Sequence, residues 1–178
     1  MNKENPIVSN IKFYLSDKRC KPVKAHNTDV GYDLRAYDII KGYQGTNLMT
    51  DDKLEYIKNR FKEYGYVTLG QNERLLIDSG IKLEYMPDNI ELQIRPRSGM
   101  SLKRGLISYF GTIDPDYRGQ LGLIVGNATT YPIRIERFER IAQLVPAWIV
   151  KHTFEFVDEK DNFETHRGNS GFGDSGTM

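Results

Sequence analysis

The sequence predicts an all-β domain, either a sandwich or a barrel, with one inserted helix. Most apolar residues recur with period two, in short runs separated by glycine, proline, asparagine or aspartate. Short strands with frequent turns are typical of all-β architectures. One segment, residues 50–65, repeats its apolar residues at helical spacing instead. The 178 residues suffice for one domain with a hydrophobic core and leave little for a second.

Seven apolar runs are interpreted as strands. In one of them Ile90, Leu92 and Ile94 alternate with polar residues, so they share one face of the predicted strand. The last run contains the only tryptophan, Trp148, which we expect in the core or at a subunit interface. The predicted strands are residues 11–15, 31–39, 73–85, 89–96, 120–125, 132–138 and 141–150.

Residues 51–64 predict a surface helix. Thr50 precedes them as an N-cap, acidic residues occupy the first turn, and Gly65 follows the end. We therefore expect one helix inserted into an otherwise β domain. Its apolar face is expected to consist of Leu54, Ile57, Phe61 and Tyr64.

Composition argues against several classes of function. The formal net charge is +1, so long-range attraction to nucleic acid or to an anionic membrane is not expected. Cys20 is the only cysteine, which excludes an intrachain disulfide and a cysteine metal cage. The first residues lack the apolar run of a signal peptide, and no run approaches the roughly 18 apolar residues of a membrane span. These features predict a soluble protein of the cytoplasm, or of the host cytoplasm or nucleus if a virus encodes it.

Residues 95–105, RPRSGMSLKRG, bring four cationic residues, two serines and two glycines together after a predicted strand. Backbone amides of a Ser-Gly turn, a hydroxyl group and nearby guanidinium groups suit a phosphate chain. A solvated basic loop is the alternative interpretation.

Residues 28–36, TDVGYDLRA, place Asp29 and Asp33 four residues apart, on one face of an extended chain. Carboxylates that face a phosphate chain require a hard cation between them, most suitably Mg²⁺ that keeps most of its waters. In the alternative interpretation these are turn residues that cap backbone amides.

Two further stretches carry an unusual concentration of functional side chains. Residues 111–127 begin with a proline-containing turn that groups two acids, a tyrosine and an arginine. From about residue 158 the chain is polar and glycine-rich. Such a tail is either a disordered end or a segment that folds over a ligand, where an arginine binds an anion and a phenylalanine stacks.

Five stretches in fixed order resemble the motifs of the homotrimeric deoxyuridine triphosphatases (dUTPases). They are TDVGYDLRA, RPRSGMS, GTIDPDYRG, RIAQLVP and RGNSGFGDSG, and the resemblance spans nearly the whole chain except its first residues and an insertion at about 41–70. It implies a distorted β-barrel or jelly-roll of the dUTPase type over residues 1–157. Residues 158–178 would form a flexible, glycine-rich arm that closes an active site, that of a neighbouring subunit in the trimer.

The resemblance implies hydrolysis of dUTP to dUMP and pyrophosphate, which keeps uracil out of DNA and supplies dUMP for thymidylate synthesis. Asp114 would activate the water that attacks the α-phosphorus, while Asp116 is the second choice and more suited to ordering the turn. Tyr117 would lie against the deoxyribose and exclude a 2′-hydroxyl group. Backbone groups would pair with uracil around Ser108, Gly111, Thr112, Ile113 and Gly122.

The same resemblance implies residues for the phosphates and the metal ion. Arg97, Ser98 and Gly99 would hold the α- and β-phosphates. Gln143 would reach the phosphates or a metal-bound water, and Asp33 would contact Mg²⁺ through water. Residues of the arm would complete the site from another subunit, so that a lone subunit would be inactive. These are Arg167 and Ser175 at the γ-phosphate, Phe172 over the uracil ring, and Gly173 beside it.

The chain departs from the family pattern at several positions. Phe138 stands where the family has a glycine-containing turn, which leaves the geometry before the last strand open. Ser108 replaces an asparagine of several relatives, and Asp174 adds a carboxylate near the expected γ-phosphate position. We expect Arg118 and Arg140 to form ion pairs within or between subunits.

Two alternative functions are considered. A dCTP deaminase shares the Arg-Ser loop and the hairpin, but it needs a glutamate in the following strand, and residues 120–127 contain none. The same absence disfavours a bifunctional enzyme. A nucleotide-switched protein-binding module would use the 51–64 helix, with Tyr56, Lys58 or Arg60 facing a partner. A loop elaboration that packs at the trimer edge is the simpler interpretation of that helix.

Overall fold

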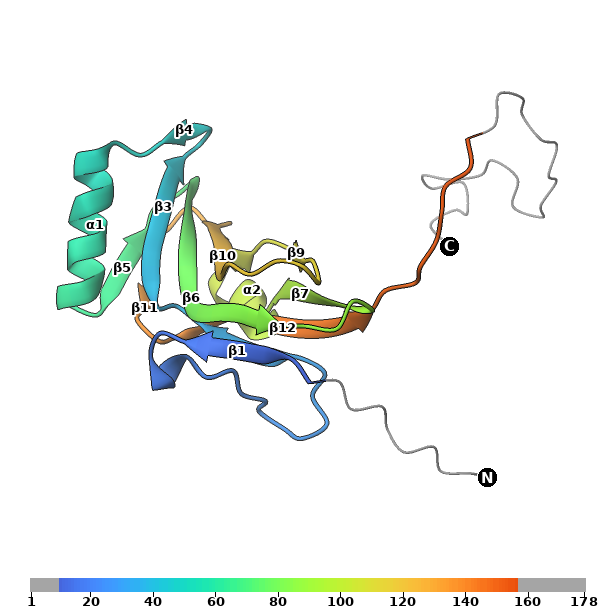
Figure 1. The fold of residues 1–178 in the computed structure, drawn as a ribbon. Coiled ribbons are helices and arrows are strands. Elements are labelled where there is room, and N and C mark those ends of the chain that lie inside the picture. The colour runs from blue at the N-terminus through green and yellow to red at the C-terminus, as the bar shows by residue number, and fades with distance from the viewer. Residues whose placement is uncertain (1–9, 157–178) are drawn as a thin grey trace, which may run out of the picture.

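The computed structural model of the chain describes residues 10–156. Within them, twelve strands, two α-helices and one short 3-10 helix form a predominantly β fold (Figure 1). None of the helices in this part of the chain has the length and apolar character needed to span a membrane. The helices are η1 (Lys18–Cys20), α1 (Asp51–Glu63) and α2 (Ser98–Arg104). The strands are β1 (Lys12–Leu15), β2 (Tyr32–Arg35), β3 (Asp38–Gln44), β4 (Asn47–Leu48), β5 (Tyr66–Leu69), β6 (Glu73–Tyr85), β7 (Ile90–Pro96), β8 (Leu106–Ser108), β9 (Gly111–Ile113), β10 (Gln120–Asn127), β11 (Ile133–Glu136) and β12 (Arg140–Trp148).

The strands form three antiparallel sheets. The largest has the order β4-β3-β6-β10-β8, and β1 also pairs with β6. The second has the order β2-β12-β7-β9, and the third joins β11 to β5. These sheets form a jelly-roll-like arrangement and not a closed barrel. The predicted all-β fold with an inserted surface helix is therefore confirmed.

Strand β6 holds the largest sheet together because it changes partner along its length. Residues 73–78 pair with β3 and residues 81–85 pair with β1, while β10 pairs along the opposite edge. Gly80 lies between the two pairings with a φ of 72°. This left-handed conformation costs glycine little because it has no Cβ atom. Figure 1 shows β6 bending between its two halves.

One hydrophobic cluster joins all three sheets and helix α1. It includes Leu34 of β2, Phe61 of α1, Ile77 of β6, Leu92 of β7 and Ile135 of β11, each almost fully buried. Burial of this apolar surface is the main favourable term in folding. The inserted helix therefore contributes directly to the core.

Helix α1 begins where the sequence predicts it. The Thr50 hydroxyl oxygen accepts a hydrogen bond from the Lys53 backbone amide at 3.4 Å. Ile57 and Phe61 are buried, as predicted, and the helix lies beside β3 and β5. Tyr64, in contrast, is 67% exposed. Its prediction as a packed residue is wrong because the helix ends at Glu63 and Tyr64 begins the exit turn.

Three features differ from the predicted strand pattern. Residues 31–39 form two strands, because the amides of Ala36 and Tyr37 donate to carbonyls of other segments. Strand β5 lies inside the expected insertion and pairs with β11. Trp148 is 56% exposed at the end of β12, so its predicted place in the core is wrong. Its alternative place at a subunit interface stays a prediction.

The thiol of Cys20 lies against Gly80 and is fully buried. Burial raises the pKa of this thiol to about 11. Because the thiolate is the reactive form, we expect Cys20 to react with Ellman's reagent at pH 8 about 100-fold more slowly in the folded protein than in urea. The unfolded chain loses this proton first, so the free energy of unfolding should fall between pH 9 and 11. Equal reaction rates in both states would contradict this prediction.

Candidate active site

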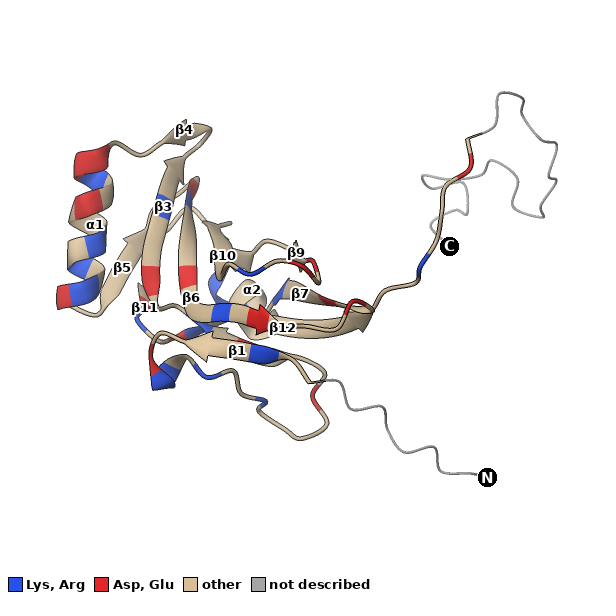
Figure 2. Ribbon diagram, viewed as in Figure 1, with Lys and Arg blue, Asp and Glu red and all other residues tan. Residues whose placement is uncertain are grey.

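The turn after β9 carries the predicted general base. Pro115 is its second residue, where the ring presets φ, and the Tyr117 amide donates to the Asp114 carbonyl at 3.1 Å. Arg118 Nη1 donates to the carbonyls of Pro115 and Tyr117, both at 2.7 Å. Within residues 10–156 it forms no ion pair, so its expected ion pair with another subunit stays a prediction. Asp114 and Asp116 are exposed, and Figure 2 shows acidic residues in the loop that follows β9.

The Tyr117 ring folds back over Gly119. Its hydroxyl group donates to the Gln120 carbonyl at 2.8 Å, and the side chain is 41% exposed. A Cβ atom at position 119 would lie 2.1 Å from the Tyr117 hydroxyl oxygen. Gly119 is therefore required for this tyrosine position, although it is not among the site residues predicted from the sequence. The available signal was a glycine two residues after the tyrosine in the same turn.

The two strands that flank this turn, β9 and β10, are not paired with each other. We call them the two arms of the turn, as distinct from the C-terminal arm. Strand β9 pairs with β7 at the edge of its sheet, and β10 pairs with β6 and β8 in another sheet. Residues 111–127 therefore do not form a simple hairpin, because the two strands belong to different sheets. Along residues 111–113 and 120–123, each arm has one backbone edge without a strand partner in the described chain. Such edges can pair with the polar groups of a planar base.

Two residues predicted to face uracil have structural roles. The Ser108 hydroxyl group is buried and donates to the Ile141 carbonyl at 2.7 Å. The backbone of Ser108 is opposite Val125 in the β8–β10 ladder. A Cβ atom at position 122 would lie 2.8 Å from a methyl carbon of Leu76, so Gly122 permits close packing of β10 on β6. Gly111, Thr112 and Ile113 lie on the open arm β9.

Residues 98–104, expected in a loop, form the short helix α2. Buried Met100 anchors this helix to the core, and the Arg97 carbonyl accepts the amides of Met100 and Ser101 at 3.0 Å. Ser98 and Gly99 are exposed at its start, and a Cβ atom on Gly99 would meet nothing within 4 Å. The backbone there is open to a ligand.

Asp33 connects two arginines from distant segments. Asp33 is buried, with 8% of its surface exposed. Its carboxylate pairs with Arg97 Nε at 2.7 Å and with Arg140 Nη1 at 3.0 Å. Arg97 also donates from Nη1 to the Arg140 carbonyl at 2.7 Å. The predicted ion pair of Arg140 is thus confirmed. Asp29 instead accepts the His26 amide at 2.8 Å and caps a turn, as in its alternative interpretation.

The donor set beside Asp33 does not form a metal cage. Residues 10–156 contain no group of three or more histidine, cysteine, aspartate or glutamate side chains that could hold a metal ion. One buried carboxylate fits a hydrated Mg²⁺ ion that is bound mainly by phosphate oxygens. It does not fit an ion that is held by protein ligands alone.

Gln143 brings the separate motifs together on one sheet. On β12 it is opposite Asp33 of β2 on one side and Arg95 of β7 on the other. Its Nε2 atom donates to the Pro96 carbonyl at 2.9 Å. A Cβ atom on Gly31 would lie 2.3 Å from Gln143 Oε1, so a glycine is needed there. No hydrogen bond or ion pair within the described residues joins this cluster to the turn at Asp114.

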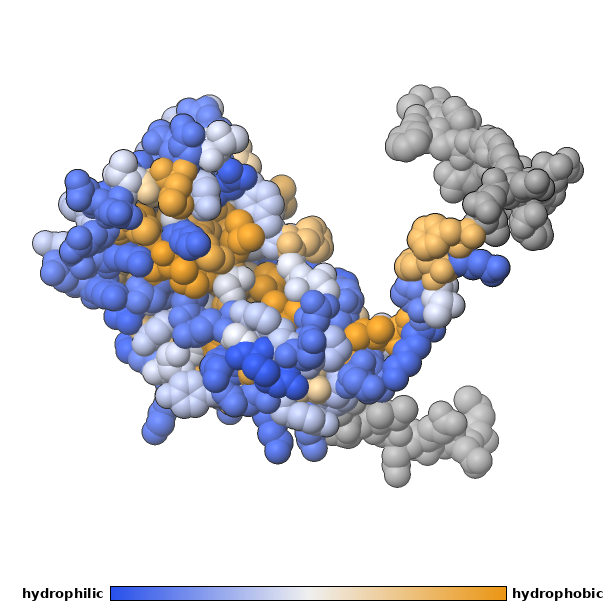
Figure 3. All heavy atoms as spheres, turned by 45° about the horizontal axis from the view of Figure 1, so that its top comes forward, coloured by the Kyte–Doolittle hydropathy of each residue, from blue (hydrophilic) through white to orange (hydrophobic). Residues whose placement is uncertain are grey.

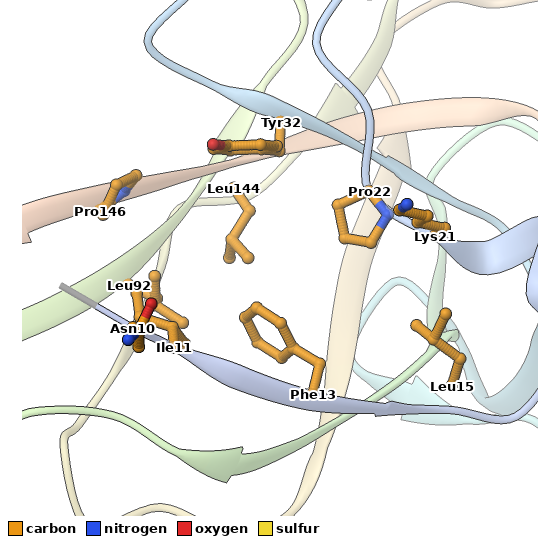
Figure 4. A pocket seen from close by; sticks show the side chains of 10 residues that line it. All are labelled: Asn10, Ile11, Phe13, Leu15, Lys21, Pro22, Tyr32, Leu92, Leu144 and Pro146. Carbon is orange, nitrogen blue, oxygen red and sulfur yellow. The ribbon is translucent and has the colours of Figure 1, made fainter. Parts of the chain in front are cut away.

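An apolar groove lies elsewhere on the molecule. It has a volume of about 560 Å³ and lies between β1 and the sheet of β2, β12 and β7 (Figure 4). Its lining is mainly apolar, including Phe13, Leu92, Leu144 and Pro146, and contains no carboxylate. It contains none of the residues predicted for the site, so it is not the candidate active site. The residues predicted in the C-terminal arm lie outside the described residues: Arg167, Phe172, Gly173 and Ser175.

Comparison with known proteins agrees with this geometry. The dUTPase family model matches residues 62–176. The deoxyuridine 5'-triphosphate nucleotidohydrolase of Roseobacter denitrificans is 43% identical over 114 residues, which cover 63% of this chain and 73% of that protein. The protein of the same name from Caldanaerobacter subterraneus is 45% identical over 114 residues, with coverage of 63% and 75%.

Solved structures show the same fold. The dUTPase of Staphylococcus bacteriophage 80alpha, solved as a point mutant with dUpNHpp, has a TM-score of 0.69 and 25% identity, and the match covers 94% of this chain and 98% of that one. A point mutant of the dUTPase of phage phi11, described with a structural Mg(II) ion, has a TM-score of 0.63 and 19% identity, with coverage of 86% and 99%.

Proposed function

The chain belongs to the dUTPase family and is a dUTP diphosphatase, and we propose that Asp114 is the general base with which it hydrolyses dUTP to dUMP and pyrophosphate. The observation that carries this assignment is the turn between β9 and β10, where the exposed Asp114 is joined to Tyr117 by a backbone hydrogen bond. The Asp114 carboxylate accepts a proton from the water that attacks the α-phosphorus. Proton transfer of this kind contributes about 10²–10⁴-fold to a rate.

The two arms select the nucleoside. Backbone groups of Gly111, Thr112 and Ile113, together with the edge of β10 at Gly122 that has no strand partner, pair with uracil. Unpaired buried polar groups would penalise cytosine in such a site. The Tyr117 ring, fixed over Gly119 and by its bond to Gln120, lies against the deoxyribose and leaves no room for a 2′-hydroxyl group. The hydroxyl group of Ser108 donates to the Ile141 carbonyl and supports β8, so only the backbone of this residue can contribute to base recognition.

The cluster on the β2-β12-β7 sheet binds the triphosphate. Arg97, Ser98 and Gly99 contact the α- and β-phosphates, and the Gln143 amide reaches the same oxygens. Mg²⁺, which dUTPases generally use, supplies neutralisation of the phosphate charge when bound. Asp33 would hold this hydrated ion through water. The fit rests on the lone pairs that the two Asp33 oxygens keep beside their guanidinium partners, because these can accept hydrogen bonds from metal-bound water.

The assembly is a homotrimer in which residues 158–178 of one subunit close the site of another. The segment after β12 supports this arrangement, because it leaves the body of its own chain (Figure 1). Its apolar residues Val150, Phe154 and Phe156 are each more than three-quarters exposed in the single chain. Figure 3 shows apolar atoms along this segment. Exposed apolar surface of this kind is typical of a segment that packs on a partner.

Truncation tests the role of the arm. Removal of residues 167–178 should leave the trimer intact in gel filtration and lower kcat/KM for dUTP by about 10²-fold or more, since Arg167 and Phe172 would be lost. A point control is Phe172→Ala, which should raise KM by about 5–100-fold through the lost stack. Wild-type kinetics in the truncated protein would exclude the arm from the site.

The substrate class is tested with four nucleotides. Pyrophosphate release is measured from dUTP, dCTP, dTTP and UTP, with Mg²⁺ and with EDTA. We expect release from dUTP at a kcat/KM at least about 10²-fold above the others, because the unpaired edges match uracil and Tyr117 excludes ribose. EDTA should abolish it. Ammonia release from dCTP would instead identify a deaminase.

A second candidate role is a protein-binding surface on helix α1. Tyr56 and Tyr64 are 62% and 67% exposed, and Arg60 lies between them with a hydrogen bond to the Tyr56 hydroxyl at 3.3 Å. Tyrosine and arginine are enriched in protein interfaces. The double variant Tyr56→Ala and Tyr64→Ala should keep wild-type dUTP hydrolysis. A loss of hydrolysis would show that this face serves the enzyme and not a partner.

A further inference from the structure

The turn before β12 holds a phenylalanine in a backbone conformation that favours glycine. Phe138 has a φ of 65°. In residues 10–156 only Asn72, with a φ of 59°, is another non-glycine residue in this region. Asparagine tolerates it through its short polar side chain, whereas the Cβ atom of a bulky residue crowds the following carbonyl. Such strain persists only where the surroundings fix it.

The surroundings of Phe138 include the hydrophobic core, the Tyr37 ring with its centroid 6.0 Å away, and two arginines. The Arg19 guanidinium lies 3.8 Å from the ring centroid, and that of Arg137 lies 5.0 Å from it. Asp17 fixes Arg19 by accepting from its Nε at 3.0 Å and from its Nη2 at 2.6 Å. These hydrogen bonds lower the pKa of Asp17 to about 2, so the carboxylate is charged at neutral pH. We call Asp17, Arg19, Arg137 and Phe138 the aromatic clamp.

The turn that holds Phe138 of the aromatic clamp is attached to β2, the strand that carries Asp33. The Phe138 amide donates to the Ala36 carbonyl at 2.6 Å, and the Phe138 carbonyl accepts from Arg35 Nη1 at 2.8 Å. The Ala36 amide donates to the Glu139 carbonyl at 2.9 Å. The end of β2 and the start of β12 are thus held together through the backbone of this turn.

The same turn sets the position of Arg97. Two residues after Phe138, the Arg140 carbonyl accepts from Arg97 Nη1 at 2.7 Å. The Arg140 guanidinium and Arg97 Nε also share the two oxygens of Asp33. A shift of the backbone at Phe138 would therefore move both contacts that orient the Arg97 guanidinium. Because hydrogen bonds to phosphate depend on guanidinium orientation, phosphate binding would weaken.

We propose that Phe138 is a positioning residue for triphosphate binding, which acts through the 137–140 turn on Arg97 and does not itself touch the nucleotide. The proposal rests on the assignment of Arg97 to the phosphates under the proposed function. A glycine at this position could adopt several backbone conformations, whereas the Phe138 ring fixes one. The contacts of the ring with Arg19 and Arg137 offset the strain of that conformation.

The test uses Phe138→Gly, which adopts the observed φ without a Cβ atom but lacks the ring. We expect KM for dUTP to rise about 5–20-fold with kcat within about 2-fold of the wild type. The inhibition constant of deoxyuridine, which has no phosphate, should stay within about 2-fold. Phe138→Tyr, which retains an aromatic ring, should have a KM close to that of the wild type. Arg19→Gln should raise KM in the same direction, because it removes the stacked guanidinium.

Asn72→Gly is the matched control, since it removes the other left-handed side chain at the β5–β6 turn and should leave KM unchanged. A wild-type KM in Phe138→Gly would overturn the proposal. So would an equal rise of KM and of the deoxyuridine constant, or a fall in kcat alone, which indicates partial unfolding. Failure of the wild type to hydrolyse dUTP would refute the proposed function instead. The dissociation constant of dUpNHpp, measured by calorimetry, then still decides whether Phe138→Gly weakens phosphate binding.

Discussion

Replacement of Asp114 by asparagine should lower kcat for dUTP by about 10²–10⁴-fold and leave nucleotide affinity near that of the wild type. Asparagine keeps the size of the side chain but cannot accept a proton from water. The turn should survive, because it is closed by the backbone of Tyr117 and braced by Arg118. The measurements are single-turnover pyrophosphate release and calorimetric binding of dUpNHpp.

Asp116→Asn is the control for this experiment, because it removes one exposed carboxylate from the same turn. It should keep kcat within about 5-fold of the wild type, since a charge in solvent is strongly screened. A wild-type rate in Asp114→Asn would remove Asp114 from the role of base. If Asp116→Asn alone lost the activity, the two aspartates would have to exchange roles.

Replacement of Gly80 by alanine should destabilise the fold by about 2–5 kcal/mol. The left-handed backbone alone costs an alanine about 1–2 kcal/mol, and overpacking adds about 1–3 kcal/mol. The added Cβ atom would lie 2.4 Å from Sγ of the buried Cys20 and 2.9 Å from Cγ of the partly buried Tyr37. Urea denaturation measures the change in the free energy of unfolding.

Gly45→Ala separates these two contributions. Gly45 has a φ of 59°, and a Cβ atom there would meet nothing within 4 Å. This control should show only the backbone cost of about 1–2 kcal/mol. Equal losses in both variants would mean that the interior around Cys20 relaxes to accept a methyl group.

The elements that the sequence predicted correctly are those that interactions between residues close in sequence define. Helix α1 has its cap at Thr50 and its buried pair Ile57 and Phe61 at helical spacing. Strand β6 has the predicted limits, residues 73–85, because apolar residues alternate along it. Helix α2 was not predicted because seven residues with a glycine give no helical period, and buried Met100 stabilises it through the core.

The site was predicted less completely because its contacts are non-local. The resemblance placed Arg97 and Gln143 at the phosphates and Asp33 at the metal ion, but the register that sets Gln143 opposite Asp33 and Arg95 follows from sheet order. The separation of β9 from β10 could not be predicted, since each arm pairs with a strand that is distant in sequence. Phe138 departs visibly from the family pattern, yet neither its left-handed φ nor its contact with Arg19, more than a hundred positions away, follows from that departure.

Helix α1 has consequences for how this protein can be dissected genetically. Its side chains Ile57 and Phe61 belong to the common hydrophobic cluster, and Lys62 and Lys53 pair with Asp38 and Glu73 of the largest sheet. Excision of the helix would therefore open the interior and reduce the yield of folded enzyme, whatever its outer face does. A separation-of-function allele must instead be sought among solvent-facing point changes. The insertion is an integral part of the domain and cannot be treated as a removable module.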